Sequence, residues 1–409
     1  MRLVFVNHCH PDTPHVCATR MREFAKSMAA RGHKIILFTE TLETGPAEIS
    51  SEESAGLIQS HDFSTPLYIA SAPTGHPLIQ SLRNRTLPSG VRQAVVVWHY
   101  LRHKGVFTDW RHGSQPYLQT IADTFKPDLV WSTFGNTDCW NIAQDLAKFT
   151  GCPWLGDVKD PWGNFIPAIF QNYLSRHFDD SAALTTFSEF HSKDASKWFS
   201  PPANLIYSGF SHDCLESSKT VEPEKLVISL TGAIYDDIAL SQLIQGIRDW
   251  IMDLPDDQRA RVRLIYAGQD SENVEAATGI LLDLCEVDIK GFVSLTELGA
   301  IHQSAIANLY IKSSFTFHHK TIEMLSAGRP LICFPEETEE AKNIAGSTQV
   351  PLLSCATPEE VTIALNQSMS NGQIDVQDDE GLRNLTWEAQ SEKLEKVFKD
   401  VLSEDGSHG

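Results

Sequence analysis

The sequence predicts an α/β protein with two doubly wound domains, each a parallel sheet with helices on both faces. Three observations support this. The chain has 409 residues, more than one hydrophobic core usually holds. From the N-terminus onward, short apolar runs typical of buried strands alternate with segments of helical periodicity. The same alternation begins again near residue 226, after a polar stretch at about 211–224 that resembles a linker.

The first half opens with a strand–helix unit. Residues 2–6 predict a strand, and Met21, Phe24 and Met28 then recur at helical spacing before a stop at Gly32. The irregular stretch from about 40 to 113 is interpreted as loops plus a helix that covers the sheet. The other elements expected in this half are strands at 33–39, 127–133, 153–157, 183–188 and 204–207 and a helix at about 139–149.

The second half repeats this organisation without a detectable sequence repeat. Its expected elements are strands at 226–232, 263–268, 287–291, 305–311 and 331–334, a helix at 240–254 and a final amphipathic helix at about 386–402. We therefore predict domains at 1–212 and 213–385 and a C-terminal segment, 386–409, that can pack back toward the first domain. Ligands of such folds bind beyond the carboxyl ends of the strands, so a cleft between the domains is the expected site.

The composition excludes several classes of protein. Hydrophobic residues make up 42% of the chain, but no run approaches the ~18 apolar residues that a membrane span needs. A net charge of −20 argues against partners such as nucleic acid or an anionic membrane surface. The eight cysteines form no C-x-x-C pair, and no secretion signal is evident, which favours reduced thiols in the cytoplasm.

One helix near the C-terminus carries a cation and a carboxylate one turn apart. Lys320 and Glu323 share a face of this helix, Gly328 can end it in the left-handed conformation, and Pro330 stops it. The pair has two interpretations. It is either an ordinary surface ion pair, or a site where Lys320 meets a phosphate and Glu323 accepts hydrogen bonds from sugar hydroxyls.

Several short motifs occur in a characteristic order over nearly the whole chain. They are Leu3-Val-Phe-Val-Asn-His8, Lys126-Pro-Asp-Leu-Val-Trp-Ser-Thr133, Thr150-Gly-Cys-Pro-Trp-Leu-Gly-Asp-Val-Lys-Asp-Pro-Trp162, Ile206-Tyr-Ser-Gly-Phe210, Thr231-Gly-Ala-Ile-Tyr235, Tyr266-Ala-Gly268, Gly291-Phe-Val-Ser294 and Lys320…Glu323…Gly328-Arg-Pro330. Together they resemble the GT-B glycosyltransferases, specifically the retaining family 4 type of bacterial polysaccharide and natural-product pathways.

The resemblance implies that the first domain binds an acceptor and the second a nucleoside-diphosphate sugar. Glu323 then matches the acid that binds the ribose. The family's other acid falls on Phe315, and the basic residue that the family often places after Gly232 is absent, so phosphate charge is left to Lys320, Arg329 or helix N-termini. The residues assigned to donor binding are Glu323, Gly232, Tyr235, Gly268, Phe292, Arg329 and Arg20, with Lys320 as the catalytic cation.

In the first domain, His8 and Asp160 are the other catalytic candidates. His8, Cys9, His10, Asp12 and His15 could ligate a metal, contact substrate or form an ordinary loop, but their spacing matches no closed metal site, and no metal or cofactor is expected.

Two further candidates have structural alternatives. Asp160 either borders the acceptor or bonds backbone N–H groups in a turn before Pro161. Arg20 either contacts phosphate or acceptor, or lies on a helix surface.

We therefore expect a cytoplasmic glycosyltransferase that moves a sugar from a nucleoside diphosphate to a hydroxyl of a small-molecule or glycan acceptor, with retention. The alternatives are a nucleotide-sugar epimerase of the same architecture and a degenerate, non-catalytic binding or scaffold protein. The sequence indicates no oligomeric state.

Overall fold

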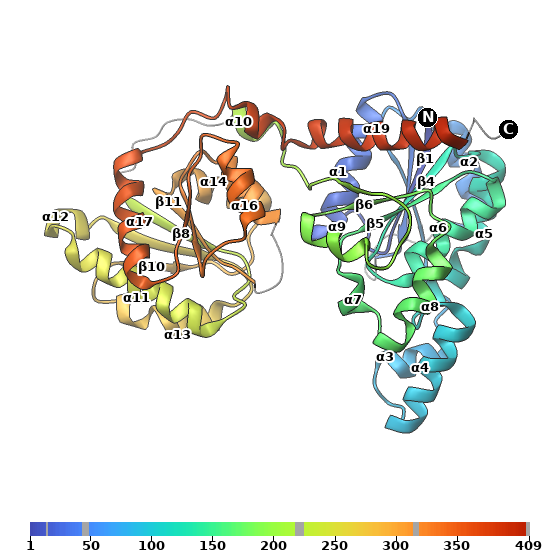
Figure 1. Cartoon of the computed structure of the whole chain (residues 1–409), viewed down its shortest axis with the longest axis horizontal. Helices are drawn as coiled ribbons and strands as arrows, with labels where there is room; N and C mark the ends of the chain where they lie inside the picture. Colours follow the sequence, from blue (N-terminus) through green and yellow to red (C-terminus); the bar gives the residue numbers. More distant parts are fainter. Residues whose placement is uncertain (14, 43–48, 217–224, 314–318, 406–409) are drawn as a thin grey trace. The chain divides into compact units, whose positions relative to one another are not determined.

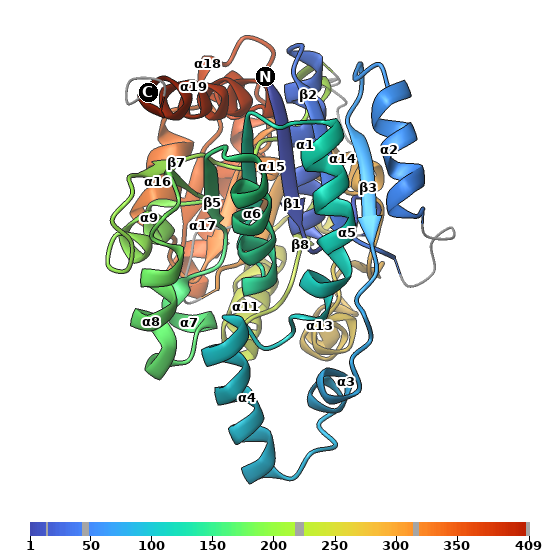
Figure 2. The same ribbon diagram turned by 90° about the vertical axis from the view of Figure 1, so that its right-hand side faces the viewer.

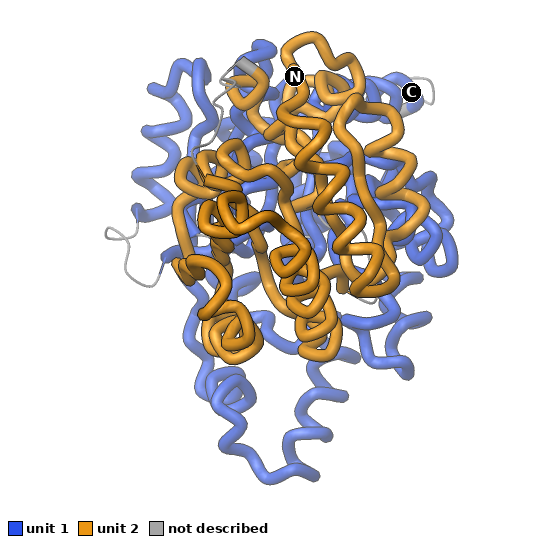
Figure 3. The backbone as a smooth tube through the Cα atoms, turned by 90° about the vertical axis from the view of Figure 1, so that its left-hand side faces the viewer, with its two compact units in different colours: residues 1–207, 390–409 blue, residues 208–389 orange. Residues whose placement is uncertain are grey.

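The computed structural model describes residues 1–13, 15–42, 49–216, 225–313 and 319–405. Phe315 and most of the polar stretch predicted to be a linker lie outside these residues. The chain divides into two compact units (Figure 3), and we describe each by itself. Unit 1 comprises Met1–Tyr207 and Gln390–Gly409, and unit 2 comprises Ser208–Ala389.

Unit 1 is built on a seven-stranded sheet whose order is β3-β2-β1-β4-β5-β6-β7 (Figure 1). All described pairings are parallel, as the strand–helix alternation predicts. The strands are β1 (Arg2–Asn7), β2 (Lys34–Glu40), β3 (Leu67–Ser71), β4 (Leu129–Thr133), β5 (Trp154–Val158), β6 (Ala183–Thr186) and β7 (Ala203–Leu205).

Helices cover both faces of this sheet. They are α1 (Val16–Ala30), α2 (Ser51–Ser60), α3 (Pro77–Arg83), α4 (Ser89–His103), α5 (Asp109–Thr124), α6 (Thr137–Thr150), α7 (Trp162–Phe165), α8 (Ala168–Phe178) and α9 (Glu189–Ala195). Successive side chains of a strand point to opposite faces of the sheet. Val4 of β1 points to the face covered by α5 and α6, which lie in front of the sheet in Figure 2. Phe5 faces the other way and contacts Trp131 at a centroid distance of 4.9 Å.

The last helix, α19 (Trp387–Asp405), begins in unit 2, but its residues from Gln390 onward belong to unit 1. Phe398 packs 6.2 Å from the Phe5 ring, and Glu395 Oε2 lies 2.5 Å from Arg31 Nη2 at the end of α1. Burial alone would raise the pKa of Glu395, but hydrogen bonds from Lys399 and Arg31 lower it to about 2. The helix is therefore attached to unit 1 by both apolar and ionic contacts.

The stretch from 40 to 113 is more ordered than the sequence indicated. Instead of loops and one helix, it contains α2, β3, α3, α4 and the start of α5. The strand β3 has only five residues and lies at the edge of the sheet, where one neighbour stabilises it, so its sequence pattern is weak. Figures 1 and 2 show α3 and α4 extending beyond one end of the sheet.

Unit 2 has a six-stranded parallel sheet of order β10-β9-β8-β11-β12-β13. Its strands are β8 (Leu226–Thr231), β9 (Val262–Ala267), β10 (Glu286–Ile289), β11 (Ala307–Ile311), β12 (Leu331–Phe334) and β13 (Leu352–Ser354). The sequence predicted all of them except β13, a three-residue edge strand. The prediction of two doubly wound α/β sheets is confirmed.

The helices of unit 2 complete its two outer layers. They are α10 (Asp213–Glu216), α11 (Asp237–Asp253), α12 (Asp256–Arg259), α13 (Ser271–Thr278), the 3₁₀ turn η1 (Gly279–Leu281), α14 (Leu295–Ser304), α15 (His319–Leu325), α16 (Glu339–Gly346), α17 (Pro358–Asn371) and α18 (Glu380–Arg383). Among the helices described in either unit, none is both long and apolar enough to cross a bilayer.

Candidate functional site

Two glycines end neighbouring strands of unit 2, as the sequence predicted. Gly232 follows β8 with φ +91°, and a Cβ there would lie 3.1 Å from Lys320 Nζ. A Cβ on Gly268, after β9, would lie 2.4 Å from the Gly232 carbonyl oxygen and 2.3 Å from the hydroxyl of Tyr266. A side chain at either position would require neighbouring atoms to move, so both turns need glycine.

Lys320, in the first turn of α15, lies at the same end of the sheet. Its Nζ donates a hydrogen bond of 3.1 Å to the Ile311 carbonyl at the end of β11. The ammonium lies 5.1 Å from the ring centroid of Tyr310 and 5.4 Å from that of Tyr235, distances typical of cation–π contacts. Burial lowers the pKa of Lys320 to about 8.

No acid that the structure describes lies close to Lys320. Among the residues that the structure describes, no carboxylate oxygen lies within 4.0 Å of its Nζ. Glu337 accepts a hydrogen bond of 3.2 Å from Tyr310 and acts on Lys320 only over a longer distance. The structure thus brings together Gly232, Tyr235, Gly268 and Lys320, four residues that the sequence singled out separately.

Glu323 lies one turn further along α15 and is partly exposed. Its Oε1 is 3.1 Å from His319 Nε2. Burial alone would raise the pKa of Glu323, but His319 and, more weakly, His302 lower it below its usual value. The carboxylate therefore stays ionised and can accept hydrogen bonds. Its partner in the structure is His319, not the Lys320 of the surface-pair interpretation.

The sequence missed three side chains that support this site. Tyr266 donates a hydrogen bond of 3.0 Å to the Gly232 carbonyl and accepts one of 3.1 Å from the Asp270 backbone. Tyr310 lies under Lys320, and His302 is 3.2 Å from the hydroxyl of Thr231 through its Nε2. Tyr266 begins one of the short motifs, but a tyrosine inside a strand looks like an ordinary core residue, so the sequence assigned no role to Tyr266 or Tyr310.

The run after Gly232, where the sequence lacks the expected basic residue, has a structural role. Asp236 caps α11 by accepting hydrogen bonds from the backbone of Ile238 and Ala239 at 2.8 and 3.0 Å. Tyr235 precedes the cap and is 51% exposed. Phe292, after β10, is 74% exposed and accessible to a ligand.

The structure does not support the role predicted for Arg329. Its side chain is buried, and its Nε donates a hydrogen bond of 2.9 Å to the Gln303 carbonyl. It is therefore held inside unit 2 and is not placed to meet a phosphate. Phe315, which stands at the position of the family's other acid, lies outside the described residues.

Arg20 also differs from its predicted role. It forms a two-point ion pair with Asp157, with distances of 3.0 Å from Nε to Oδ2 and 2.8 Å from Nη2 to Oδ1. Both side chains are at most 1% exposed, and Nη2 also donates to the Ile206 carbonyl. Arg20 thus connects α1, β5 and the segment after β7, and this burial does not support contact with a phosphate or an acceptor.

His8 and Asp160, the other catalytic candidates, lie in one cluster at the carboxyl ends of β1 and β5. Asp160 pairs with the neighbouring Lys159 at 3.2 Å, and burial raises the pKa of Asp160. Burial likewise lowers the pKa of His8, which favours the neutral imidazole. The His8 ring packs against Gly135, where a Cβ would lie 1.9 Å from its Cε1.

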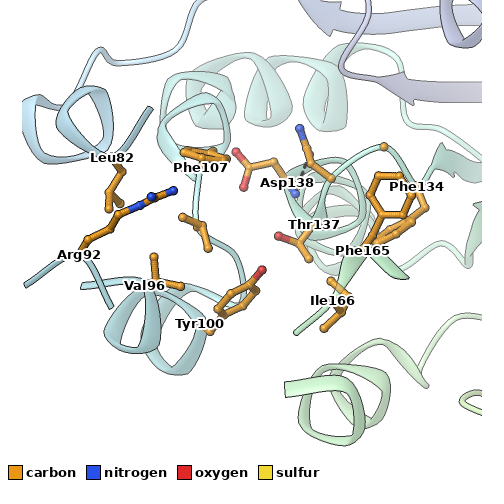
Figure 4. Close-up of a pocket in the computed structure, with 13 residues that line it drawn as sticks. Leu82, Arg92, Val96, Tyr100, Phe107, Phe134, Thr137, Asp138, Phe165 and Ile166 are labelled. Atoms are coloured by element: carbon orange, nitrogen blue, oxygen red, sulfur yellow. Dashed lines mark hydrogen bonds between the residues drawn. The ribbon is translucent and has the colours of Figure 1, made fainter. Parts of the chain in front are cut away.

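A cavity of about 510 Å³ opens in unit 1 beyond the carboxyl end of β4. Figure 4 shows apolar side chains of α4 and the loop after it on one side, and the segment after β4 with α7 on the other. It is lined by Leu82, Arg92, Val96, Tyr100, Val106, Phe107, Phe134, Gly135, Asn136, Thr137, Asp138, Phe165 and Ile166. Most of this lining is aromatic or aliphatic, which suits a ligand with an apolar part.

One buried carboxylate lies in the cavity wall. Asp138 is 2% exposed, and its Oδ2 accepts a hydrogen bond of 3.3 Å from the Arg111 backbone. Its Oδ1 has no hydrogen-bond partner among the described atoms. Burial raises the pKa of Asp138 well above its usual value. An unsatisfied buried oxygen in a cavity is a natural partner for a ligand hydroxyl.

The comparisons with known proteins gave matches among solved structures only. No protein-family model matches the sequence, and no curated protein does. HepE from Anabaena, in complex with UDP and glucose, is similar over 98% of this chain and 100% of its own, with a TM-score of 0.60 and 11% identity.

Two further solved structures illustrate the range of similar proteins. Sucrose-phosphate synthase from Thermosynechococcus elongatus covers 98% of this chain and 99% of its own, with a TM-score of 0.63 and 12% identity. A protein from Listeria monocytogenes that is described as a UDP-N-acetylglucosamine 2-epimerase covers 98% of this chain and 97% of its own, with a TM-score of 0.58 and 10% identity. At such low identity these similarities concern the fold. The chain has the GT-B fold, with two Rossmann-like α/β units.

Proposed function

We propose that the chain is a glycosyltransferase that moves a sugar from a nucleoside-diphosphate sugar to an acceptor hydroxyl, with retention at the anomeric carbon. The observation that carries the proposal is the position of Lys320. Its ammonium lies next to the Gly232 turn, between two tyrosine rings, and has no carboxylate within 4.0 Å among the described residues. A cation held in this way is suited to an anionic ligand.

The donor is assigned to the carboxyl end of the sheet in unit 2. The diphosphate approaches the backbone at the Gly232 and Gly268 turns, which carry no side chains of their own, and Lys320 neutralises the charge that develops on the leaving phosphate. Glu323, ionised and partly exposed, accepts hydrogen bonds from the ribose. Phe292 offers an exposed ring on which a base can stack. HepE, of the same fold, binds UDP and UDP-glucose.

The acceptor is assigned to the cavity of unit 1. Its aromatic and aliphatic lining suits a molecule with an apolar body, and Asp138 Oδ1 can accept a hydrogen bond from one of its hydroxyls. The acceptor expected is therefore an amphiphilic small molecule or glycan conjugate. His8 packs against Gly135, which lines this cavity, and Asp160 is near His8, so both are candidates for contacts with the sugar or the acceptor.

The reaction that we propose uses no resident cofactor. The bond between the anomeric carbon and the phosphate oxygen breaks, and the acceptor oxygen bonds to the same face of that carbon. The acceptor proton passes to the departing phosphate oxygen. Lys320 stabilises the negative charge on that oxygen more strongly than it stabilises the intact donor, which is the condition for raising the rate.

The test begins with calorimetry of the protein against UDP, GDP and ADP. Release of free nucleotide is then measured with the matching glucose and N-acetylglucosamine donors. We expect Lys320→Ala to lower kcat/KM by about 10²–10³-fold, as does the loss of other preorganised charge-stabilising donors. Lys342→Ala is the matched control, because Lys342 pairs with Glu336 and Glu339 at the surface of the same unit.

The outcomes separate the three functions. Transfer gives free nucleotide and a glycosylated acceptor with the donor's anomeric configuration. An epimerised sugar would instead support the second candidate, which the similarity to the epimerase of the same fold favours. Nucleotide binding without any turnover would indicate a non-catalytic binding protein, and normal turnover by Lys320→Ala would refute the site.

A further inference from the structure

Three potential metal ligands converge at the start of unit 1. A ring nitrogen of His8 and the sulfur atoms of Cys9 and Cys17 all lie within 4.8 Å of one another. His8 and Cys9 follow β1, whereas Cys17 lies in the first turn of α1. The sequence grouped His8 and Cys9 as potential metal ligands but left out Cys17, which is eight positions from Cys9 and meets it only in the folded chain.

Hydrogen bonds hold the described residues around this cluster in place. His15 caps α1, because its Nδ1 accepts a hydrogen bond of 3.1 Å from the backbone N–H of Cys17. The same nitrogen is 3.7 Å from the Cys9 sulfur. Asn7 donates to the Cys17 carbonyl at 3.2 Å, and its Oδ1 lies 3.2 Å from the Cys17 sulfur. The loop therefore positions both thiols before any ligand arrives.

Cys17 is fully buried, while Cys9 and His8 are partly exposed, which leaves a path from solvent to the sulfurs.

We propose that His8, Cys9 and Cys17 form a binding site for a thiophilic divalent metal ion of the Zn²⁺ type. Sulfur and imidazole ligands are those that Zn²⁺ prefers, and they discriminate against Mg²⁺ and Ca²⁺. Metal–ligand lengths of about 2.0–2.3 Å in a tetrahedral site place donor atoms roughly 3.5–3.8 Å apart, so the side chains need to move inward by only about 1 Å. Two thiolates neutralise the ion, and three side chains leave a fourth position for water.

Occupation of this site would affect the neighbouring cavity. His8 packs on Gly135, and Gly135 lines the cavity assigned to the acceptor. A bound ion would fix the His8 ring and join the loop after β1 to the first turn of α1. The inference does not depend on the proposed transferase activity, because metal binding is measured on the protein alone.

The experiment titrates the reduced full-length chain with Zn²⁺ in competition with a chromophoric chelator and repeats the titration with Co²⁺. We expect one ion per chain, and a thiolate-to-Co²⁺ charge-transfer band in the near ultraviolet that identifies sulfur ligands. Zn²⁺ should also raise the melting temperature, since it binds only the folded site. Mg²⁺ at the same concentration should leave the melting temperature unchanged.

Variants then test the ligands one by one. Cys9→Ser, Cys17→Ser and His8→Ala should each weaken Zn²⁺ binding by more than the roughly 10–100-fold that loss of a supporting group costs. Cys285→Ser is the matched control and should bind like the parent, because Cys285 lies in unit 2. If Cys17→Ser does not fold, the partly exposed Cys9 and His8 still decide the question. Absence of a tight site, or full affinity in Cys9→Ser and His8→Ala, would overturn the proposal.

Discussion

The carboxyl edges of the two sheets differ in how their cations are paired. In unit 1 two cations there are paired with acids, the buried Arg20 with Asp157 and the partly buried Lys159 with Asp160. In unit 2, Lys320 lies among aromatic rings and carbonyls with no carboxylate within 4.0 Å among the described residues. A buried, unpaired charge lowers stability, so a folded chain retains one mainly where a ligand will pair with it.

The groups that surround the space beside each sheet also differ in polarity. Unit 1 presents a largely apolar cavity in which, among the described residues, Asp138 has an unsatisfied carboxylate oxygen. Unit 2 presents glycine turns and the exposed rings of Tyr235 and Phe292. Under the proposed assignment, the same architecture would bind a partly apolar acceptor in unit 1 and an anionic nucleotide in unit 2.

The largest effect is expected from breaking the buried ion pair of unit 1. Asp157→Ala leaves the Arg20 guanidinium buried without its carboxylate and should lower the free energy of unfolding by about 3–5 kcal/mol. Chemical denaturation followed by tryptophan fluorescence measures this. The matched control is Asp128→Ala, whose partly exposed pair with Arg2 should contribute less than ~1 kcal/mol. Equal effects of the two variants would contradict the structural role of Arg20.

Filling the cavity of unit 1 should separate acceptor use from donor binding. Val96→Trp places an indole in the cavity and should raise the KM for an apolar acceptor at least tenfold, equivalent to ~1.4 kcal/mol, while the Kd for UDP stays unchanged. Val91→Trp serves as the control, because Val91 is 51% exposed on the same helix and does not line the cavity. An equal rise in the Kd for UDP would contradict the assignment of the acceptor to unit 1 and of the donor to unit 2.

The pKa of Lys320 predicts how donor affinity depends on pH. A diphosphate binds the charged amine, so the pKa of Lys320 must be higher in the complex than its value of about 8 in the free protein. Affinity for UDP is thus expected to be steady below pH 8 and to fall by up to about tenfold per pH unit above it. Calorimetry between pH 7 and 9.5 measures this.

The variant Lys320→Arg keeps its charge over that range and should abolish the decline. A decline that persists in Lys320→Arg would assign the titration to another group. Lys320 would then not be the feature that distinguishes the ligand site of unit 2 from unit 1.

The smallest effect is expected at Phe292. Because its ring is 74% exposed, Phe292→Ala should leave the melting temperature unchanged. It should weaken UDP binding by about 0.5–1.5 kcal/mol through the lost stacking. Leu282→Ala, at a residue 66% exposed in the same unit, is the control for loss of surface area. Unchanged affinity in Phe292→Ala would remove the aromatic part of the donor site and leave only Lys320 and the glycines.

Local patterns were sufficient for much of the fold and for part of the site. Buried parallel strands are continuous apolar runs, so β1, β8 and β11 could be predicted without knowledge of their partners. The stop at Gly328, with φ +65°, followed from the glycine and the proline after it. Edge strands such as β3 and β13 escaped detection, because one neighbour and a short length leave only a weak pattern.

The two successive series of parallel strands and helices, and the positions of Gly232, Gly268 and Lys320 in the second series, follow from spacing along the chain and could be predicted from it. Which charges meet depends on the folded chain. It gave Arg20 a buried acid 137 positions away, enclosed Arg329, kept the described carboxylates away from Lys320 and brought Cys17 to Cys9. Electrostatic energy depends on distance in space and on burial, and neither can be read from separation in sequence.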